Sequence, residues 1–295
     1  RTWARWACAS SEHRPAKPAP MNAPATVITT ATQFNTGNGQ YRYQGSVISD
    51  VSRNNGMLDA AGILRRSSNI GMTMISERLT SQEMWNKFTE LGFGRSPQAD
   101  FPGIASGRLR PWERWRPIER ATMSYGYGLS VTAVQLAHAY SVLANHGKNV
   151  QLSMVRLDRQ PVSTQVIDQQ IAKTVLGMLQ AVVEEPGGGG ARAKVPGYHV
   201  GGKSGTARKA ATGSKGYVDK AYRSFFAGVA PIDNPRIAAV IMIDEPSEGG
   251  YYGGLVSAPV FGKVMSGALR LMNVAPDNLP APEAAQVETA AAAPV

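Results

Sequence analysis

Three stretches of the chain combine a helix-capping residue with hydrophobic residues at helical spacing. Thr80 with Glu83 and Thr132 with Gln135 have the spacing of a capping box, in which each side chain accepts a hydrogen bond from the other residue's backbone N–H. Asp168 is a third capping residue, and helices are therefore predicted to begin directly after Thr80, Thr132 and Asp168. Their buried faces would carry Trp85 and Phe88; Ala133, Leu136, Tyr140 and Leu143; and Ile171, Val175, Met178 and Val182.

Strand patterns cluster later in the chain. Two apolar runs, 224–230 and 237–243, flank the turn sequence 233–235, which reads Asp-Asn-Pro, and together they predict an antiparallel hairpin. Residues 203–209 alternate as a strand does, and a last helix is expected to follow Pro259. Because helices come first and strands follow, the order favours an α+β fold with an antiparallel sheet.

Three segments of different character divide the chain. Residues 1–22 show neither a helical nor a strand period and contain three prolines, so we expect an aberrant or disordered start. Residues 23–272 carry the pattern of a folded domain. Residues 273–295 are rich in alanine and proline, which predicts a disordered tail.

Composition narrows the class of protein only a little. The 295 residues are 43% hydrophobic and carry a formal net charge of +10, which suits a globular domain with anionic partners. Cys8 is the single cysteine, so no internal disulfide can form. No stretch of the sequence approaches the roughly 18 apolar residues of a membrane span, and no signal peptide is recognisable at Arg1.

One motif suggests a nucleotide site. Gly197–Ser204 matches the phosphate-binding pattern G-x-x-x-x-G-K-[ST]. Asp244 ends an apolar run, and its carboxylate could help to hold Mg²⁺. Such a loop must follow a buried strand and open a helix, whose free N–H groups bind phosphate. The preceding segment 187–194 is glycine-rich and charged, and glycines interrupt the segment that follows. A P-loop protein is therefore the alternative rather than the leading hypothesis.

Lys203, the lysine of that pattern, also fits a different site. On a strand, Ser204, Thr206 and Arg208 share one face, where two hydroxyls and a guanidinium can bind a carboxylate, and Gly205 lets a substrate backbone approach. Far upstream, Ser67 and Asn69 could relay a proton and hold an amide. A helix cap is the competing interpretation of that short Ser-Ser-Asn sequence.

A stretch of interleaved basic and aromatic residues between 108 and 116 raises the question of nucleic-acid binding. Pro111, Pro117, Glu113 and Glu119 interrupt it, so a solvated loop is favoured and no nucleic-acid partner is expected.

Taken together, the motifs resemble those of a class B penicillin-binding protein of the septal, cell-division type. The resemblance extends to residues 50–54, 120–132, 135–140, 222–224, 227–231 and 253–261. It implies the penicillin-binding-protein and serine β-lactamase fold, incomplete at its N-terminus, and a D,D-transpeptidase that cross-links peptidoglycan stem peptides. It also implies β-lactam binding, divisome membrane proteins as partners, and a place on the periplasmic side of the bacterial inner membrane. No metal or cofactor is expected, and the membrane anchor is expected to lie outside this sequence.

The same resemblance assigns roles to residues. Ser67 would relay a proton with the support of Lys203, and Asn69 would hold the donor amide. The terminal carboxylate would bind Ser204 and Thr206, with Arg208 behind them, and the Thr206 N–H would form half of the oxyanion hole. Tyr222, Tyr251 and Tyr252 would form a wall against the substrate, with ordinary sheet packing as the competing interpretation.

The resemblance fails at the family's first motif, Ser-x-x-Lys, which supplies the nucleophile and its base. The sequence has Arg14 at the serine position, followed by Pro15, Ala16 and Lys17. A guanidinium cannot attack a carbonyl, so we expect a fragment without a nucleophile there, inactive alone, and whether the chain is an enzyme stays open. A frameshifted or truncated reading is favoured over a true pseudoenzyme, because everything before Lys17 is unlike the family.

Overall fold

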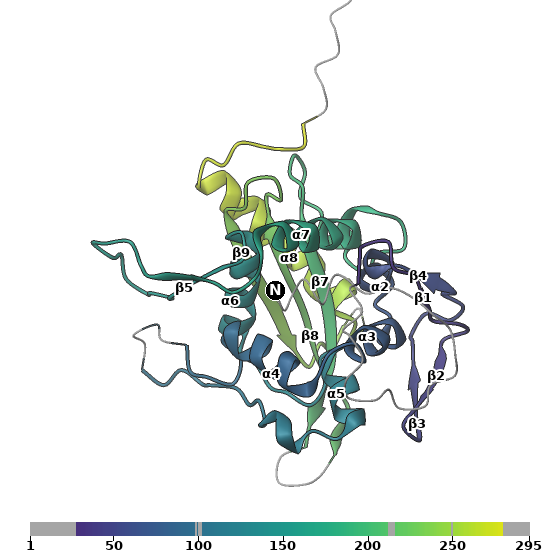
Figure 1. Ribbon diagram of the computed structural model, residues 1–295. Helices are drawn as coiled ribbons and strands as arrows, with labels where there is room; N and C mark the ends of the chain where they lie inside the picture. Colours follow the sequence, from purple (N-terminus) through teal and green to yellow (C-terminus); the bar gives the residue numbers. More distant parts are fainter. Residues whose placement is uncertain (1–27, 98, 100–101, 212–215, 249, 280–295) are drawn as a thin grey trace, which may run out of the picture.

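The computed structural model describes residues 28–97, 99, 102–211, 216–248 and 250–279 (Figure 1). Its largest sheet has the strand order β7-β8-β9, with both neighbouring pairs antiparallel. These strands are β7 (Gly201–Ala210), β8 (Tyr217–Ala230) and β9 (Ile237–Asp244). The helices are α2 (Ala60–Arg66), α3 (Asn69–Ser76), α4 (Ser81–Glu90), α5 (Pro117–Met123), α6 (Ala133–Ala144), α7 (Gln169–Glu184) and α8 (Gly253–Leu271).

Short strand pairs and single helical turns complete the described part of the chain. The pairs are β1 (Phe34–Asn35) with β4 (Met57–Leu58), β2 (Gln40–Tyr43) with β3 (Ser46–Ser49), and β5 (Lys148–Val150) with β6 (Ser163–Gln165). The two 3₁₀ turns are Trp112–Arg114 and Ala191–Ala193.

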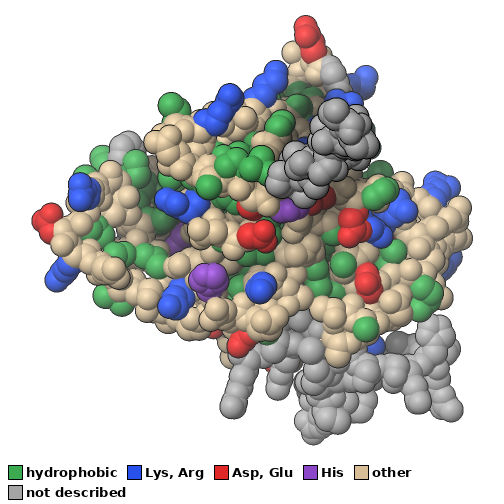
Figure 2. All heavy atoms as spheres, turned by 90° about the horizontal axis from the view of Figure 1, so that it is seen from above, with side chains coloured by type: hydrophobic (Ala, Val, Ile, Leu, Met, Phe, Trp, Pro, Cys, Tyr) green, Lys and Arg blue, Asp and Glu red, His purple; other side chains and the backbone are tan. Residues whose placement is uncertain are grey.

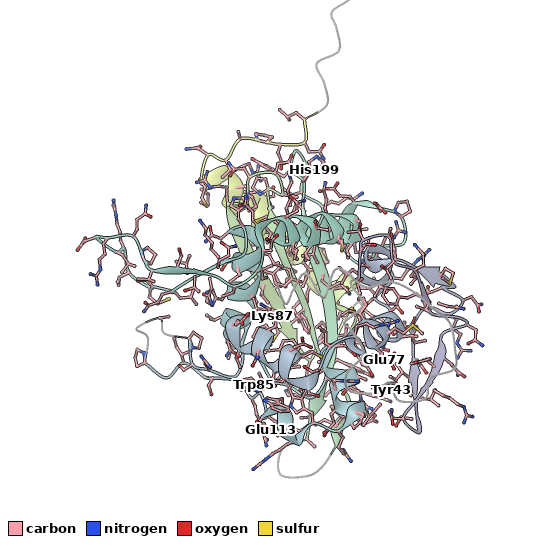
Figure 3. The ribbon with its side chains drawn as sticks, viewed as in Figure 1. Tyr43, Glu77, Trp85, Lys87, Glu113 and His199 are labelled. Carbon is pink, nitrogen blue, oxygen red and sulfur yellow. The ribbon has the colours of Figure 1, made fainter. Side chains whose placement is uncertain are left out.

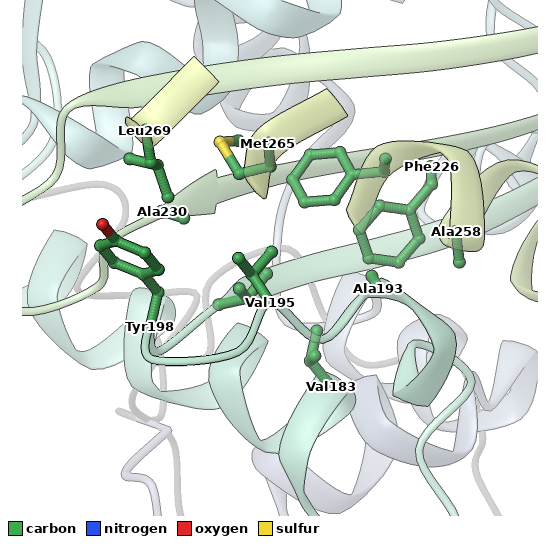
Figure 4. Packing of buried hydrophobic residues seen from close by; sticks show 11 residues of the cluster. Val183, Ala193, Val195, Tyr198, Phe226, Ala230, Ala258, Met265 and Leu269 are labelled. Atoms are coloured by element: carbon green, nitrogen blue, oxygen red, sulfur yellow. The ribbon is translucent and has the colours of Figure 1, made fainter. Parts of the chain in front are cut away.

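Helices cover both faces of the large sheet, and each face has its own core. One core lies between the sheet and α8, where the rings of Phe226 and Phe261 meet with centroids 4.9 Å apart (Figure 4). The other lies under α6 and α7, and Val229 of β8 belongs to it. Phe226 and Val229 point to opposite faces because successive strand side chains alternate. The predicted α+β class and the predicted hairpin are both present.

The three helix starts predicted from capping residues are confirmed. Thr80 and Thr132 each form a complete capping box, and Asp168 accepts hydrogen bonds from the backbone N–H groups of Gln170 and Ile171. The predicted faces are less accurate, because Ala133 is exposed and Ile171 and Val175 are only half-buried. In α6 the buried set is Gln135, Ala139, Val142 and Leu143.

Buried polar side chains explain part of that difference. Gln135 donates from Nε2 to the carbonyls of Gly92, Arg95 and Ser106 at 3.1, 2.8 and 2.9 Å, so an amide occupies a core position of α6. Lys87 of α4 is also buried, pairs with Glu90 and donates to the Val166 carbonyl at 2.6 Å (Figure 3). A hydrophobicity pattern cannot identify such positions, because their partners are distant in sequence.

Two predicted boundaries are wrong. The last helix begins at Gly253, not after Pro259, which lies inside α8 and leaves the Leu255 carbonyl without its usual backbone donor. Burial of Ser257, Ala258 and Phe261 against the sheet outweighs that loss. Strand β8 begins at Tyr217 rather than near residue 224, because its exposed first half pairs with β7 but carries no apolar pattern.

No described helix is both long and apolar enough to cross a membrane. Among the described residues, no group of three or more His, Cys, Asp or Glu side chains is arranged to hold a metal ion.

Candidate active site

The Ser67–Asn69 sequence forms a corner between two helices. Ser67 follows the last residue of α2 with φ 55° and ψ 46°, a left-handed conformation, and its N–H donates to the Leu64 carbonyl. Ser68 is the N-cap of α3 and accepts from the N–H of Gly71 at 2.9 Å. The capping interpretation is therefore correct for Ser68, whereas the side chain of Ser67 stays exposed.

The side chain of Asp50 stabilises this corner. Its buried carboxylate accepts hydrogen bonds from Ser68 Oγ at 2.6 Å, from the Ile70 N–H at 3.0 Å and from Asn55 Nδ2 at 3.2 Å. A buried carboxylate needs such donors because the loss of water is otherwise very costly. In the sequence Asp50 stands out only as part of the family-like segment 50–54, since no local pattern connects it to Ser68.

Strand β7 meets the corner through Lys203. Its ammonium donates to Ser67 Oγ at 2.9 Å and to the Ser204 carbonyl at 3.0 Å. Burial lowers the pKa of Lys203 to about 8, because the charged form loses hydration there. Lys203 and Ser67, 136 residues apart in sequence, are thus brought into direct contact.

The hydroxyls of β7 lie on the opposite face of the strand from Lys203, as strand alternation requires. Thr206 Oγ1 accepts from the backbone N–H of Gly253, the first residue of α8, at 3.0 Å. Ser204 Oγ lies beside Gly189 and Gly254, at 3.2 and 3.8 Å from where a Cβ on each would stand. Both hydroxyls therefore sit at the start of α8, where helix dipoles favour negative charge.

Packing inside the sheet explains why a glycine stands at position 205, and this reason was not predicted from the sequence. A Cβ built there would come within 2.0 Å of the Phe225 ring on β8, the residue directly opposite in the ladder. The absence of a side chain is therefore already required inside the sheet, before any substrate approaches.

The three tyrosines form one aromatic group. The rings of Tyr222 and Tyr251 stack with centroids 4.0 Å apart and an angle of 12° between their planes. The ring centroids of Tyr251 and Tyr252 are 4.6 Å apart. Tyr251 and Tyr252 are 37% and 44% exposed and precede α8 rather than lie in a strand, so ordinary sheet packing does not account for them. Arg208 is exposed and lies over the Tyr217 ring at 5.3 Å.

Asn69 is half-buried at the start of α3. Its Nδ2 donates to the Ser49 carbonyl at the end of β3, 2.9 Å away. Arg14 and Lys17 fall outside the described residues, so the geometry of the first motif stays a prediction.

The P-loop interpretation is wrong for this chain. Val195 and Tyr198 form an isolated antiparallel bridge, and the motif then enters β7 at Gly201 instead of opening a helix. Asp244 ends β9, as predicted, but forms ion pairs with Lys209 and Arg223. Without a helix start after Gly202, the motif has no row of free N–H groups for phosphate.

The basic and aromatic stretch was predicted as a solvated loop, but it contains a 3₁₀ turn and is partly packed into the fold. Arg110 and Arg116 both pair with Glu119, and Trp115 is buried with its Nε1 donating to the Arg110 carbonyl. Figure 2 shows the opposite end of the molecule, where basic and acidic side chains of the described residues are interspersed.

Comparison with known proteins places this geometry in context. The family model "Penicillin binding protein transpeptidase domain" matches residues 23–266. A probable peptidoglycan D,D-transpeptidase PbpC of Pseudomonas aeruginosa is 46% identical over 248 residues, covering 84% of this chain and 43% of that protein. The peptidoglycan D,D-transpeptidase FtsI of Escherichia coli K12 is 40% identical over 239 residues, covering 81% of this chain and 40% of that protein.

A solved structure agrees with these relatives. The transpeptidase domain of Burkholderia pseudomallei penicillin-binding protein 3 has a TM-score of 0.80 and 46% identity, covering 85% of this chain and 75% of that one. The fold expected from the motifs is therefore confirmed. The chain spans 43% and 40% of the length of the two curated relatives.

Proposed function

Because this chain belongs to the penicillin-binding protein transpeptidase domain family, we propose that it carries the substrate-holding part of a peptidoglycan D,D-transpeptidase. The observation that supports this most directly is the 2.9 Å hydrogen bond between Lys203 Nζ and Ser67 Oγ. It joins a basic strand residue to an exposed hydroxyl, which is the pair that a proton relay in acyl transfer needs.

The substrate would bind along β7. This strand is one of the two outer strands of the described three-stranded sheet, so one of its edges has no sheet partner there and can add an extended peptide as a further strand. The terminal carboxylate of a stem peptide would meet Ser204 and Thr206 at the start of α8. The N–H of Gly253 already donates to Thr206 Oγ1, and the dipole of α8 favours an anion beside these hydroxyls.

The remaining residues have supporting roles in this proposal. Lys203 supplies positive charge and exchanges a proton with Ser67, and the Thr206 N–H stabilises the oxyanion. The Tyr222, Tyr251 and Tyr252 group would contact the substrate or a β-lactam side chain. Asn69 uses one N–H of Nδ2 on the Ser49 carbonyl, and its second N–H would bind the donor peptide.

The first motif limits what the chain does by this route. Arg14 stands where the family-like pattern would place serine, with Lys17 three residues later. We therefore propose that the chain binds the substrate but does not form an acyl-enzyme at that position. Stem peptides and β-lactams are the proposed ligands, divisome membrane proteins the proposed partners, and the periplasmic side of the inner membrane the proposed location.

Peptide binding tests this function. A short peptide ending in D-Ala-D-Ala, titrated against the full chain by NMR, is expected to bind and to shift resonances of β7 and the α8 start. The same peptide with a C-terminal amide should bind at least about tenfold more weakly, since a charged hydrogen-bonded partner is worth about 1.5–3 kcal/mol. Equal binding of the two peptides would contradict the proposal.

A further inference from the structure

Ser67 and Lys203 together have the features of a nucleophile and its base. The hydroxyl of Ser67 is exposed, and the amine of Lys203 lies 2.9 Å away, within hydrogen-bond reach. The relay role in the proposed function uses this pair only to move a proton to and from another group. The same contact would also serve direct attack by Ser67.

The backbone at Ser67 presents the side chain in a fixed direction. A left-handed conformation at a residue other than glycine costs about 1–2 kcal/mol and persists only where surrounding contacts enforce it. Here the enforcing contacts are the hydrogen bonds from the Ser67 and Ser68 N–H groups to the Leu64 and Ile63 carbonyls. The buried hydrogen bonds of Asp50 to the start of α3 hold the next turn.

The environment of Lys203 favours the neutral amine that a base must be. Burial lowers its pKa to about 8, so a large share of the amine is neutral in mildly alkaline solution. A neutral amine still donates to the Ser204 carbonyl, which lies 3.0 Å away, and keeps a lone pair for the Ser67 hydroxyl proton.

We propose that Ser67 is itself an acyl acceptor, with Lys203 as its general base, toward activated acyl donors such as β-lactams and aryl esters. In the step, Ser67 Oγ forms a bond to the carbonyl carbon while its proton passes to Lys203 Nζ. The bond from that carbon to the leaving atom then breaks. With a β-lactam the ring nitrogen receives the proton from Lys203, and with an aryl ester the phenolate leaves. The product in both cases is an ester on Ser67.

The reaction is expected to be slow. The N–H groups of Ser67 and Ser68 already donate to the Leu64 and Ile63 carbonyls and cannot stabilise an oxyanion. One such donor is worth about 10²–10³ in rate, so acylation over hours rather than seconds is expected.

This activity does not depend on the carboxylate-binding residues of the proposed function. The test uses p-nitrophenyl acetate, which has no carboxylate, with the full chain. Peptide mapping by mass spectrometry follows acetylation at each serine. Failure of D-Ala-D-Ala peptides to bind would leave this test unaffected. Failure of Ser67 to become acetylated would likewise leave the peptide-binding test unaffected.

Ser67 is expected to be acetylated at least tenfold faster than Ser163, an exposed serine on β6. The rate should rise about tenfold per pH unit and level off above pH 8, as Lys203 loses its proton. Ser67→Ala should remove the adduct. Lys203→Arg keeps the positive charge but removes the base, and should slow acetylation of Ser67 at least tenfold. Ser163→Ala should leave the Ser67 rate unchanged.

Two results would overturn the proposal. One is acetylation of Ser67 no faster than that of Ser163. The other is a Lys203→Arg chain that acetylates at the wild-type rate with the same pH profile.

Discussion

The two sides of the candidate site are built by opposite means. On one side, Lys203, Ser204 and Thr206 belong to a regular strand whose ladder with β8 fixes every side chain by alternation. On the other side, Ser67 and Ser68 cap two different helices, and a buried carboxylate from a distant loop holds the corner. The ladder therefore positions the strand side, whereas local backbone caps and the side-chain hydrogen bonds of Ser68 and Asp50 position the corner.

Helix α7 packs against both of these sides. Leu176 and Leu179 pack in the core beneath it together with Val229 of β8, and at its far end Glu185 pairs with Arg65 of α2. One helix thus contacts both the strand side and α2, which leads into the corner. The corner should be the more fragile side, because a few buried polar groups carry it and no ladder can compensate for their loss.

The largest expected effect is on the corner. Asp50→Ala removes the carboxylate that accepts hydrogen bonds from three donors, which are Ser68 Oγ, the Ile70 N–H and Asn55 Nδ2. Buried donors without partners cost about 1–3 kcal/mol each, so the free energy of unfolding should fall by about 3–5 kcal/mol in urea titrations. Asp50→Asn keeps one oxygen acceptor and should cost less. Equal losses for the two variants would show that hydrogen-bond acceptance is not what Asp50 provides.

The next effect concerns Lys203 and pH. Its pKa is about 8 when folded and 10.5 in its ordinary state, so between these values the unfolded chain binds more protons and stability rises with pH. Relative to Lys203→Met, the wild-type free energy of unfolding should rise by about 3 kcal/mol from pH 8 to pH 10.5, at about 1.4 kcal/mol per pKa unit. Below pH 8 the difference should be flat. A constant difference over the whole range would mean that burial does not perturb Lys203.

A smaller effect is expected inside the strand side. Gly205→Ala places a Cβ against the Phe225 ring, and overpacking of this kind costs about 1–3 kcal/mol. Gly267→Ala in α8 is the matched control, because a Cβ there meets nothing within 4 Å and alanine favours helix. Thermal or urea unfolding should show destabilisation at 205 and none at 267. If both changes are harmless, the Phe225 ring moves aside and Gly205 serves another purpose.

The strand side could be predicted from the sequence far better than the corner. The 203–209 alternation, the 233–235 turn and the capping pairs are local signals, so strand, hairpin and helix starts followed from them. The buried carboxylate of Asp50 accepts from Ser68 and Ile70, 18 and 20 residues away, and the buried amide of Gln135 donates to carbonyls 29 to 43 residues away. The contact of Ser67 with Lys203 spans 136 residues. The start of α8 was misplaced for a related reason, since Pro259 is a local stop signal that sheet packing overrides.

The smallest expected change in stability is at Thr206, and it tests whether this hydroxyl caps α8, binds the peptide carboxylate, or does both. Thr206→Val removes the acceptor for the Gly253 N–H and should lower the free energy of unfolding by about 1 kcal/mol, while Thr206→Ser should restore it. If Thr206 also binds the peptide carboxylate, the valine variant should weaken D-Ala-D-Ala peptide binding about tenfold, measured by the same NMR titration. A loss of stability without a loss of binding would assign this hydroxyl to the capping of α8 alone. The carboxylate would then have to bind Ser204 and the helix start, and the strand side would share with the corner a dependence on side-chain caps.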